Sequence, residues 1–131
     1  MTFSPFARRR REALKSQAGA AVEQACKFDR ASEGTPSPEA LETAVPWYDR
    51  AIPLLQELQD YDRLAMCLSR KGLAMHLAGK DLHEAFKLQD EAELLCRDHN
   101  IGIGIQASLA TKAAILTAHR QLGSRVWHGQ I

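Results

Sequence analysis

The sequence lacks the features of a membrane or secreted protein. Its 131 residues contain no apolar run close to the roughly 18 residues that a helix needs to cross a bilayer. The arginines near the N-terminus are not followed by a hydrophobic stretch, so we do not expect a secretory signal. With 45% hydrophobic and 25% charged residues, the composition indicates one globular domain.

The net charge is also small, and cysteines are few. Seventeen basic and 16 acidic residues give a charge of +1, which excludes a molecule-wide field that attracts nucleic acid or anionic membranes. The only basic run, Arg8 to Arg11, could make a local anionic contact or could be a solvated terminus. Three widely spaced cysteines do not form a disulfide framework, so we expect a reducing, cytoplasmic compartment.

Motifs for catalysis are missing. No serine lies in a G-x-S-x-G turn, and no two of the five histidines have the i, i+4 spacing of a helical zinc site. Gly102-x-Gly104-x-x-Ala107 matches a dinucleotide-binding loop in spacing, but it follows an amphipathic helix where that loop needs a strand. We therefore expect no enzymatic activity, no cofactor and no metal.

Strand patterns are absent as well, whereas apolar residues recur at intervals of three and four along most of the chain. This periodicity predicts an all-α fold of five helices, the first four at about 9–31, 37–59, 62–78 and 81–99. Asn100-Ile101-Gly102 breaks the pattern, and the fifth helix is expected to carry Ile105 and to end at about 122. We expect residues 1–8 to be a flexible N-terminus and residues 124–131 to be a tail. In that tail, Trp127 has no evident core and could fold back over the last helix.

Turn-forming residues predict the helix ends. Ser37 and Pro38 are typical of an N-cap and a first helical position, because proline has no N–H to lose there. Gly79 and Gly123 are expected to stop the third and fifth helices. Gly72, in the middle of the third helix, predicts a close backbone approach to the next helix, a role that Ala113 would fill one unit later.

The most informative feature that is present is an internal repeat. Ala44 and Ala51 are seven residues apart, and Ala85 and Ala92 repeat the pair 41 positions later. Flanking positions keep the same offset: Leu54 and Leu95, Leu64 and Ile105, Leu68 and Leu109, Lys71 and Lys112, and Met75 and Leu116. A period of this length is the mark of a stacked repeat whose units bury their apolar faces against one another.

At these positions the chain resembles the tetratricopeptide repeat family. Leu68, Gly72 and Gly79 resemble its helix A and turn, and helix B is matched by Ala44-Val45, Tyr48, Ala51-Ile52, Ala85-Phe86 and Ala92. Residues 96–100, 104–109 and 113–116 are similar to the longer variant of large bacterial signalling proteins. The resemblance implies a single domain, a five-helix right-handed solenoid of antiparallel helix-turn-helix units, in which residues 9–31 form a capping helix and residues 37–79 and 81–123 the repeats.

The same resemblance implies a scaffold that binds a peptide or partner protein on its concave face. The residues implied for that groove are Arg70, Leu73, His76, Leu77, Thr111, Ala114 and Thr117. An alternative is a self-associating structural module, or a piece of a longer array, because the unpaired fifth helix would expose an apolar face. Residues 13–58 separately resemble part of a three-helix MIT domain, through Ala21, Ala25, Asp29, Ala40, Tyr48 and Ala51-Ile52.

Overall fold

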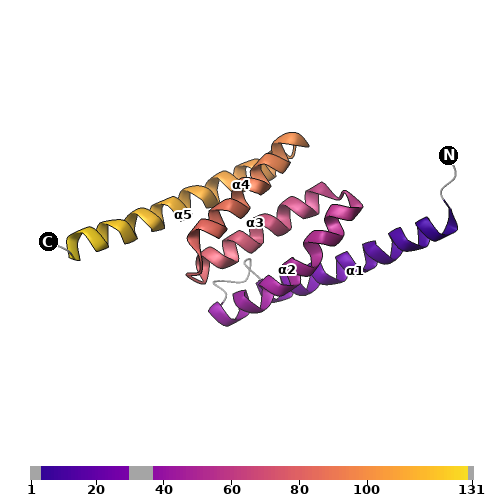
Figure 1. Ribbon diagram of the computed structural model, residues 1–131, viewed down its shortest axis with the longest axis horizontal. Helices are drawn as coiled ribbons and strands as arrows, with labels where there is room; N and C mark the ends of the chain where they lie inside the picture. The colour runs from indigo at the N-terminus through magenta and orange to yellow at the C-terminus, as the bar shows by residue number, and fades with distance from the viewer. Residues whose placement is uncertain (1–3, 30–36, 130–131) are drawn as a thin grey trace.

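The chain folds into a stack of helices. Its computed structural model describes residues 4–29 and 37–129, and in this part of the chain no residue is in a strand. The five helices are α1 (Pro5–Asp29), α2 (Pro38–Leu58), α3 (Tyr61–Leu77), α4 (Leu82–Asp98) and α5 (Gly102–Gly129). Consecutive helices pack antiparallel in chain order, so that α3 and α5 run in the same direction on either side of the returning α4 (Figure 1). The predicted all-α fold is confirmed, and the packing is that of a helical repeat.

The first helix begins earlier than predicted, at Pro5 and not near Arg9. The Ser4 hydroxyl accepts a hydrogen bond from the backbone N–H of Ala7. Ser4 and Pro5 therefore form the same cap and first position that Ser37 and Pro38 form in α2. The predicted end at residue 31 lies outside the described residues.

Two prolines lie inside α2 without ending it. The helix runs from Pro38 to Leu58 through Pro46 and Pro53, both of which have solvent-accessible surface. Because these prolines lie on the solvent side, the carbonyls that lose a partner can bond to water. The buried side of α2 carries Tyr48 instead, which has no exposed surface.

The repeat found in the sequence is also present in the backbone. The turn after α2 contains Gln59 at φ 57°, and the turn after α4 contains Asn100, the equivalent residue of the next unit, at φ 58°. The next residue in each turn donates its N–H to a carbonyl five residues back, over 3.1 Å for Asp60 and 2.8 Å for Ile101. The turn between α2 and α3 and the turn between α4 and α5 therefore have the same construction.

The two alanine pairs mark the packing surface between the helices. Ala44, Ala51, Ala85 and Ala92 all have 0% exposed surface. Most of them belong to one apolar cluster that continues through α1 and α3, whose buried members include Ala18, Ala25, Leu64, Cys67 and Leu68. Small side chains at a seven-residue spacing allow neighbouring helices to approach closely along one face.

Gly72 has the role that the sequence predicts. A Cβ atom at this position would lie 2.7 Å from Gln89 Nε2 and 2.9 Å from the Ala85 carbonyl oxygen, so only glycine allows α4 to pack this closely on α3. The corresponding prediction for Ala113 is wrong, because Ala113 is exposed. In the described chain, no helix follows α5 in the place that α4 takes beside α3.

The fifth helix is longer than predicted. It passes through Gly123 and ends at Gly129, so that residues 124–129 of the expected tail are helical, Trp127 included, and the last two residues of that tail lie outside the described residues. Gly79 supplies the turn after α3 in a left-handed conformation, at φ 70°, and the equivalent residue of the next unit is Arg120. Arginine disfavours that conformation, so α5 continues where α3 turns.

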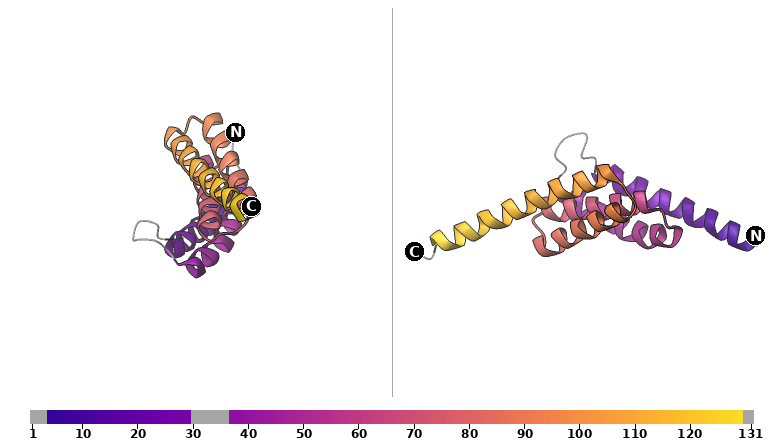
Figure 2. Two further views of the ribbon diagram at one scale, coloured as in Figure 1. Left: turned by 90° about the vertical axis from the view of Figure 1, so that its left-hand side faces the viewer. Right: turned by 90° about the horizontal axis from the view of Figure 1, so that it is seen from above.

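The ends of the stack project from its body. Figures 1 and 2 show the N-terminal turns of α1 and the C-terminal turns of α5 leaving the stack at opposite ends. On α1, Phe6 is 81% exposed. Arg8 to Arg11, in the same projecting turns, are exposed, and Arg10 forms an ion pair with Glu57 of α2.

Candidate functional site

The groove residues implied by the resemblance lie on the two helices that run in the same direction. Four of them, Arg70, Leu73, His76 and Leu77, are on α3, and three, Thr111, Ala114 and Thr117, are on α5. Their side chains differ in accessibility: Leu77 is 47% exposed, Ala114 and Thr117 are exposed, and the others are half-buried.

A cleft of about 360 Å³ lies between the N-terminal halves of α3 and α5. It is lined by Asp62, Ala65, Met66, Ser69, Arg70, Cys96, Ile101, Ile103, Gly104 and Ala107. Most of this lining is apolar, and Asp62 and Arg70 contribute charges of opposite sign from the α3 side. An apolar cleft with a few polar groups can hold a side chain and fix its orientation.

The cleft includes only one of the seven implied residues, Arg70. Leu73 and Leu77 continue the same face of α3, because residues three and four positions apart lie above one another on a helix. Ala114 lies on the α5 face of Ala107 in the same way. The implied groove and the observed cleft therefore follow the same two helix faces, and the cleft lies nearer the helix N-termini.

The polar groups among the implied residues are partly committed to other contacts. Thr111 and Thr117 donate their hydroxyls to the carbonyls of Ala107 and Ala113, over 3.0 and 2.9 Å, within their own helix. Among the described residues, His76 Nδ1 is buried and makes no hydrogen bond. Arg70 donates to Cys26 Sγ on α1, over 3.6 Å, so its guanidinium lies at the junction of α1 and α3.

Burial changes the chemistry of the cysteines near this junction. Cys67, one turn before Arg70, is fully buried, and desolvation raises the pKa of its thiol from 9.0 to about 12. The thiol of Cys96, at the base of the cleft, also has a raised pKa because of burial. A neutral thiol is a poor nucleophile and a poor metal ligand, so these two residues act as small apolar side chains.

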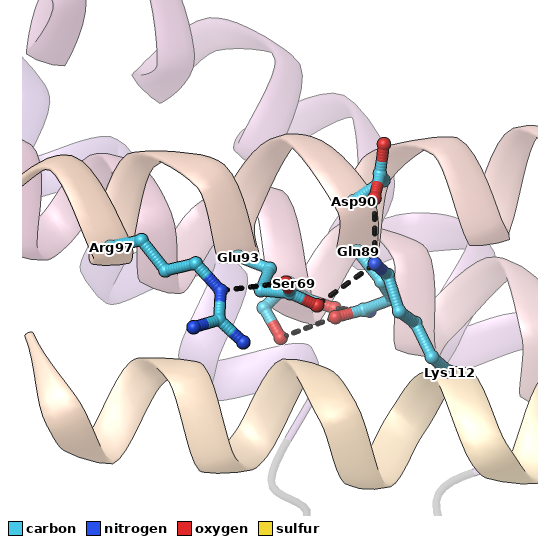
Figure 3. A network of polar contacts seen from close by, with 6 residues as sticks. All are labelled: Ser69, Gln89, Asp90, Glu93, Arg97 and Lys112. Atoms are coloured by element: carbon cyan, nitrogen blue, oxygen red, sulfur yellow. Dashed lines mark hydrogen bonds and ion pairs between the residues drawn. The ribbon is translucent and has the colours of Figure 1, made fainter.

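A polar network fixes α4 between the two groove helices (Figure 3). Gln89, which is fully buried, accepts from the Ser69 hydroxyl over 2.8 Å and donates to the Ser69 carbonyl over 2.6 Å. On the α5 side, Lys112 contacts Asp90 at 2.6 Å and Glu93 at 2.9 Å. The network therefore helps to hold α3 and α5 in place, together with the direct contacts between these two helices.

Two further clefts occupy equivalent places in the repeat. One, of about 530 Å³, is lined in part by Leu41, Glu42, Val45, Ala74 and Met75. The other, of about 400 Å³, is lined by the equivalent residues of the next unit, Leu82, His83, Phe86, Ile115 and Leu116. The first is also lined by Ala78, which caps the end of α3, and by Lys80 and Asp81, which precede α4.

Sequence reasoning missed most of the cleft lining. Met66 is one turn before Arg70 on the same face of α3, and Asp62 is a turn before that. Shifting positions 62 and 66 by one repeat period gives Ile103 and Ala107, which line the opposite wall. The helical spacing and the period together could have found all four.

Among the described residues, no group of three or more metal-ligating side chains comes together. None of the helices in the same part of the chain is both long and apolar enough to cross a membrane. No family model matches the chain, and neither a curated protein nor a solved structure shows a significant match.

Proposed function

We propose that the chain is a short helical-repeat module of the tetratricopeptide type that binds a segment of another protein. The site of binding is the cleft between α3 and α5 together with the faces that extend from it toward Leu77 and Ala114. In this proposal the chain is a scaffold without catalytic activity, in a reducing cytoplasmic environment and of the bacterial type that the resemblance implies.

The observation that carries the proposal is the composition of the cleft. Its apolar walls, Met66 and Ile103 among them, suit an apolar side chain of a peptide, and Arg70 suits a carboxylate beside it. A second support is the raised pKa of the nearby thiols, which leaves no reactive nucleophile at Cys67 or Cys96.

A displayed library of random peptides, selected on the immobilised full chain, tests the proposal. We expect the selected peptides to share an acidic residue next to an apolar one. Arg70→Glu should weaken their binding at least about tenfold, because it places like charges together. Ala107→Phe should do the same by filling the cleft without changing charge.

Lys87→Glu is the matched control, because Lys87 is an exposed cation on α4 outside the cleft lining. Circular dichroism of each variant shows whether its helices remain folded. If folded Arg70→Glu and Ala107→Phe proteins bind the selected peptides as the unmodified chain does, this cleft is not the binding site.

A further inference from the structure

The outer face of α5 is apolar and uncovered. Leu109 is 42% exposed and Leu116 is 50% exposed, and Ala113 between them is also exposed. These three residues follow the four- and three-residue spacing of one helix face. Groove residues such as Ala107 lie on a different side of the helix, so this outer face is distinct from the cleft of the proposed function.

The repeat identifies what covers the same face one unit earlier. The equivalent positions in that unit are Leu68, Gly72 and Met75 on α3. Leu68 is only 7% exposed, and a Cβ at Gly72 would meet Ala85, Leu88 and Gln89 of α4. On α3 this face is covered by the antiparallel helix α4. On α5 the equivalent face is open to solvent.

The apolar cleft of about 400 Å³ continues this face toward α4, since Leu116 is part of its wall. In the equivalent cleft one unit earlier, the turn into α4 supplies Lys80 and Asp81 as lining. A helix on α5, placed as α4 is on α3, would bring its N-terminal turn over the cleft beside Leu116.

Charge distinguishes among the possible occupants. The sequence of α5 contains Lys112, Arg120 and Arg125 but no aspartate or glutamate. Lys112 is already paired with Asp90 and Glu93 of α4. Arg120, which is exposed, is the equivalent of Gly79, at the end of the face where the N-terminal turn of an antiparallel helix would lie. Acidic residues are favoured in that first turn, because the helix dipole is positive there.

We propose that the outer face of α5, formed by Leu109, Ala113, Leu116 and Arg120, docks an acidic amphipathic helix of another polypeptide. The partner helix lies antiparallel to α5 and continues the stack as a sixth helix. Its acidic first turn faces Arg120, and its small residues face Ala113.

The chain itself supplies a suitable probe. The α4 sequence is acidic, with Asp or Glu at positions 84, 90, 91, 93 and 98 against Lys87 and Arg97, and it already covers this face on α3. A labelled synthetic peptide of residues 80–99 should carry Gln89→Ala, because Ala113 has the Cβ that Gly72 lacks and that would collide with the Gln89 side chain. The same Cβ would meet the Ala85 carbonyl, so the peptide should pack slightly farther from α5 than α4 packs from α3. Its binding to the full chain is followed by fluorescence anisotropy.

We expect saturable binding that weakens as salt increases, since the contact includes unlike charges. Leu116→Asp and Leu109→Asp should each reduce affinity at least about tenfold, through the loss of a buried leucine and the added negative charge. Arg120→Glu should reduce both the affinity and its salt dependence. A peptide with Lys at positions 84, 91 and 93 should bind at least about tenfold more weakly.

Leu94→Asp is the matched control, because Leu94 is 54% exposed and belongs to α4, not to the outer face of α5. Arg70→Glu, in the cleft, should also leave peptide binding unchanged, which separates this proposal from the proposed function. The proposal is overturned if the peptide does not bind. It is also overturned if Leu116→Asp has no effect on peptide binding, because the peptide would then be replacing the chain's own α4 on α3. It is equally overturned if the full chain alone sediments as a dimer that Leu116→Asp dissociates, because a second copy would then be the occupant.

Discussion

Lys112 Nζ lies 2.6 Å from Asp90 Oδ1, and at the equivalent positions of the preceding unit Lys71 Nζ lies 2.6 Å from Asp49 Oδ1. Each pair joins a helix to the one before it, α5 to α4 and α3 to α2. The two pairs differ in one respect, because Lys112 also contacts Glu93, which Arg97 contacts in turn (Figure 3). The repeat thus preserves an ion pair at each of these joints and enlarges it at the second.

This larger network should make stability depend on pH. The hydrogen bond from Lys112, and then that from Arg97, lowers the pKa of Glu93 below its ordinary value of 4.5. A lowered carboxyl pKa contributes stability above the ordinary value, and this contribution is lost as the pH falls toward the lowered value. We expect Glu93→Gln to reduce the urea midpoint at pH 7 and to flatten its decrease below pH 4.5.

The effect of Lys112 has the opposite sign. Burial opposes its charge, but the hydrogen bonds to Asp90 and Glu93 outweigh burial and raise the pKa. Its contribution is therefore present below the ordinary value of 10.5 and is lost as the pH rises through the raised value.

Glu91, an exposed carboxylate that like Glu93 belongs to α4, provides the control for Glu93→Gln. If Glu91→Gln flattened the acid decrease of the urea midpoint as much as Glu93→Gln does, the network would not be the cause of the pH dependence.

Gly72→Ala should destabilise the chain although alanine is the better helix former. The added Cβ would lie 2.7 Å from Gln89 Nε2 and 2.9 Å from the Ala85 carbonyl, so α3 and α4 must separate. Overpacking costs about 1–3 kcal/mol, against about 1 kcal/mol that the helix gains from alanine. We expect a net loss of about 1 kcal/mol in the free energy of unfolding by urea titration.

Gly102→Ala is the control for this substitution, because a Cβ at Gly102 meets no atom within 4 Å. It should leave stability unchanged or slightly increased. Adding Gln89→Ala to Gly72→Ala should not restore full stability, since the contact with the Ala85 backbone remains. Equal urea midpoints for the two glycine variants would contradict the close approach.

Ser108→Ala should stabilise the chain. Ser108 is 1% exposed, and among the described residues its hydroxyl is buried without a hydrogen-bond partner. Removing an unsatisfied buried hydroxyl should increase the free energy of unfolding by about 1 kcal/mol. Ser69→Ala is the opposite case, because the Ser69 hydroxyl donates to Gln89 Oε1 over 2.8 Å. This variant should lose about 1 kcal/mol in the free energy of unfolding. Changes of the same sign in both variants would refute the distinction.

The sequence predicted the parts of the fold that depend on periodicity. The repeat offset found Ala44 and Ala85, and the helical spacing with turn residues placed the ends of α2, α3 and α4 within a few residues. The end of α5 is predicted wrongly, because Gly123 does not stop the helix and the repeat places the turn at Arg120. A glycine stops a helix only where the chain gains contacts by turning, and no described helix covers α5 beyond that point.

The cleft was harder to predict than the fold. The resemblance implies Arg70, which lines the cleft, but the shape of the cleft depends on the side chains of Met66 and Ile103, which the resemblance does not specify. The buried Gln89 was also missed. It occupies the position equivalent to Tyr48, and a polar residue at a core position becomes meaningful only when its partner, here Ser69, is known.

The three cysteines should differ in reactivity in the order of their burial. Cys67 and Cys96 are buried and have raised pKa values, whereas Cys26 is half-buried and accepts a hydrogen bond from Arg70. Because the thiolate is the reactive form, iodoacetamide at pH 8 should modify Cys26 first, as measured by mass spectrometry of peptides from the folded chain. Cys67, with a pKa of about 12, should react only through opening of the helix stack, so low concentrations of urea should accelerate its modification more than that of Cys26. Modification of Cys67 as rapid as that of Cys26 in the absence of urea would show that α3 is not packed between α2 and α4 as described.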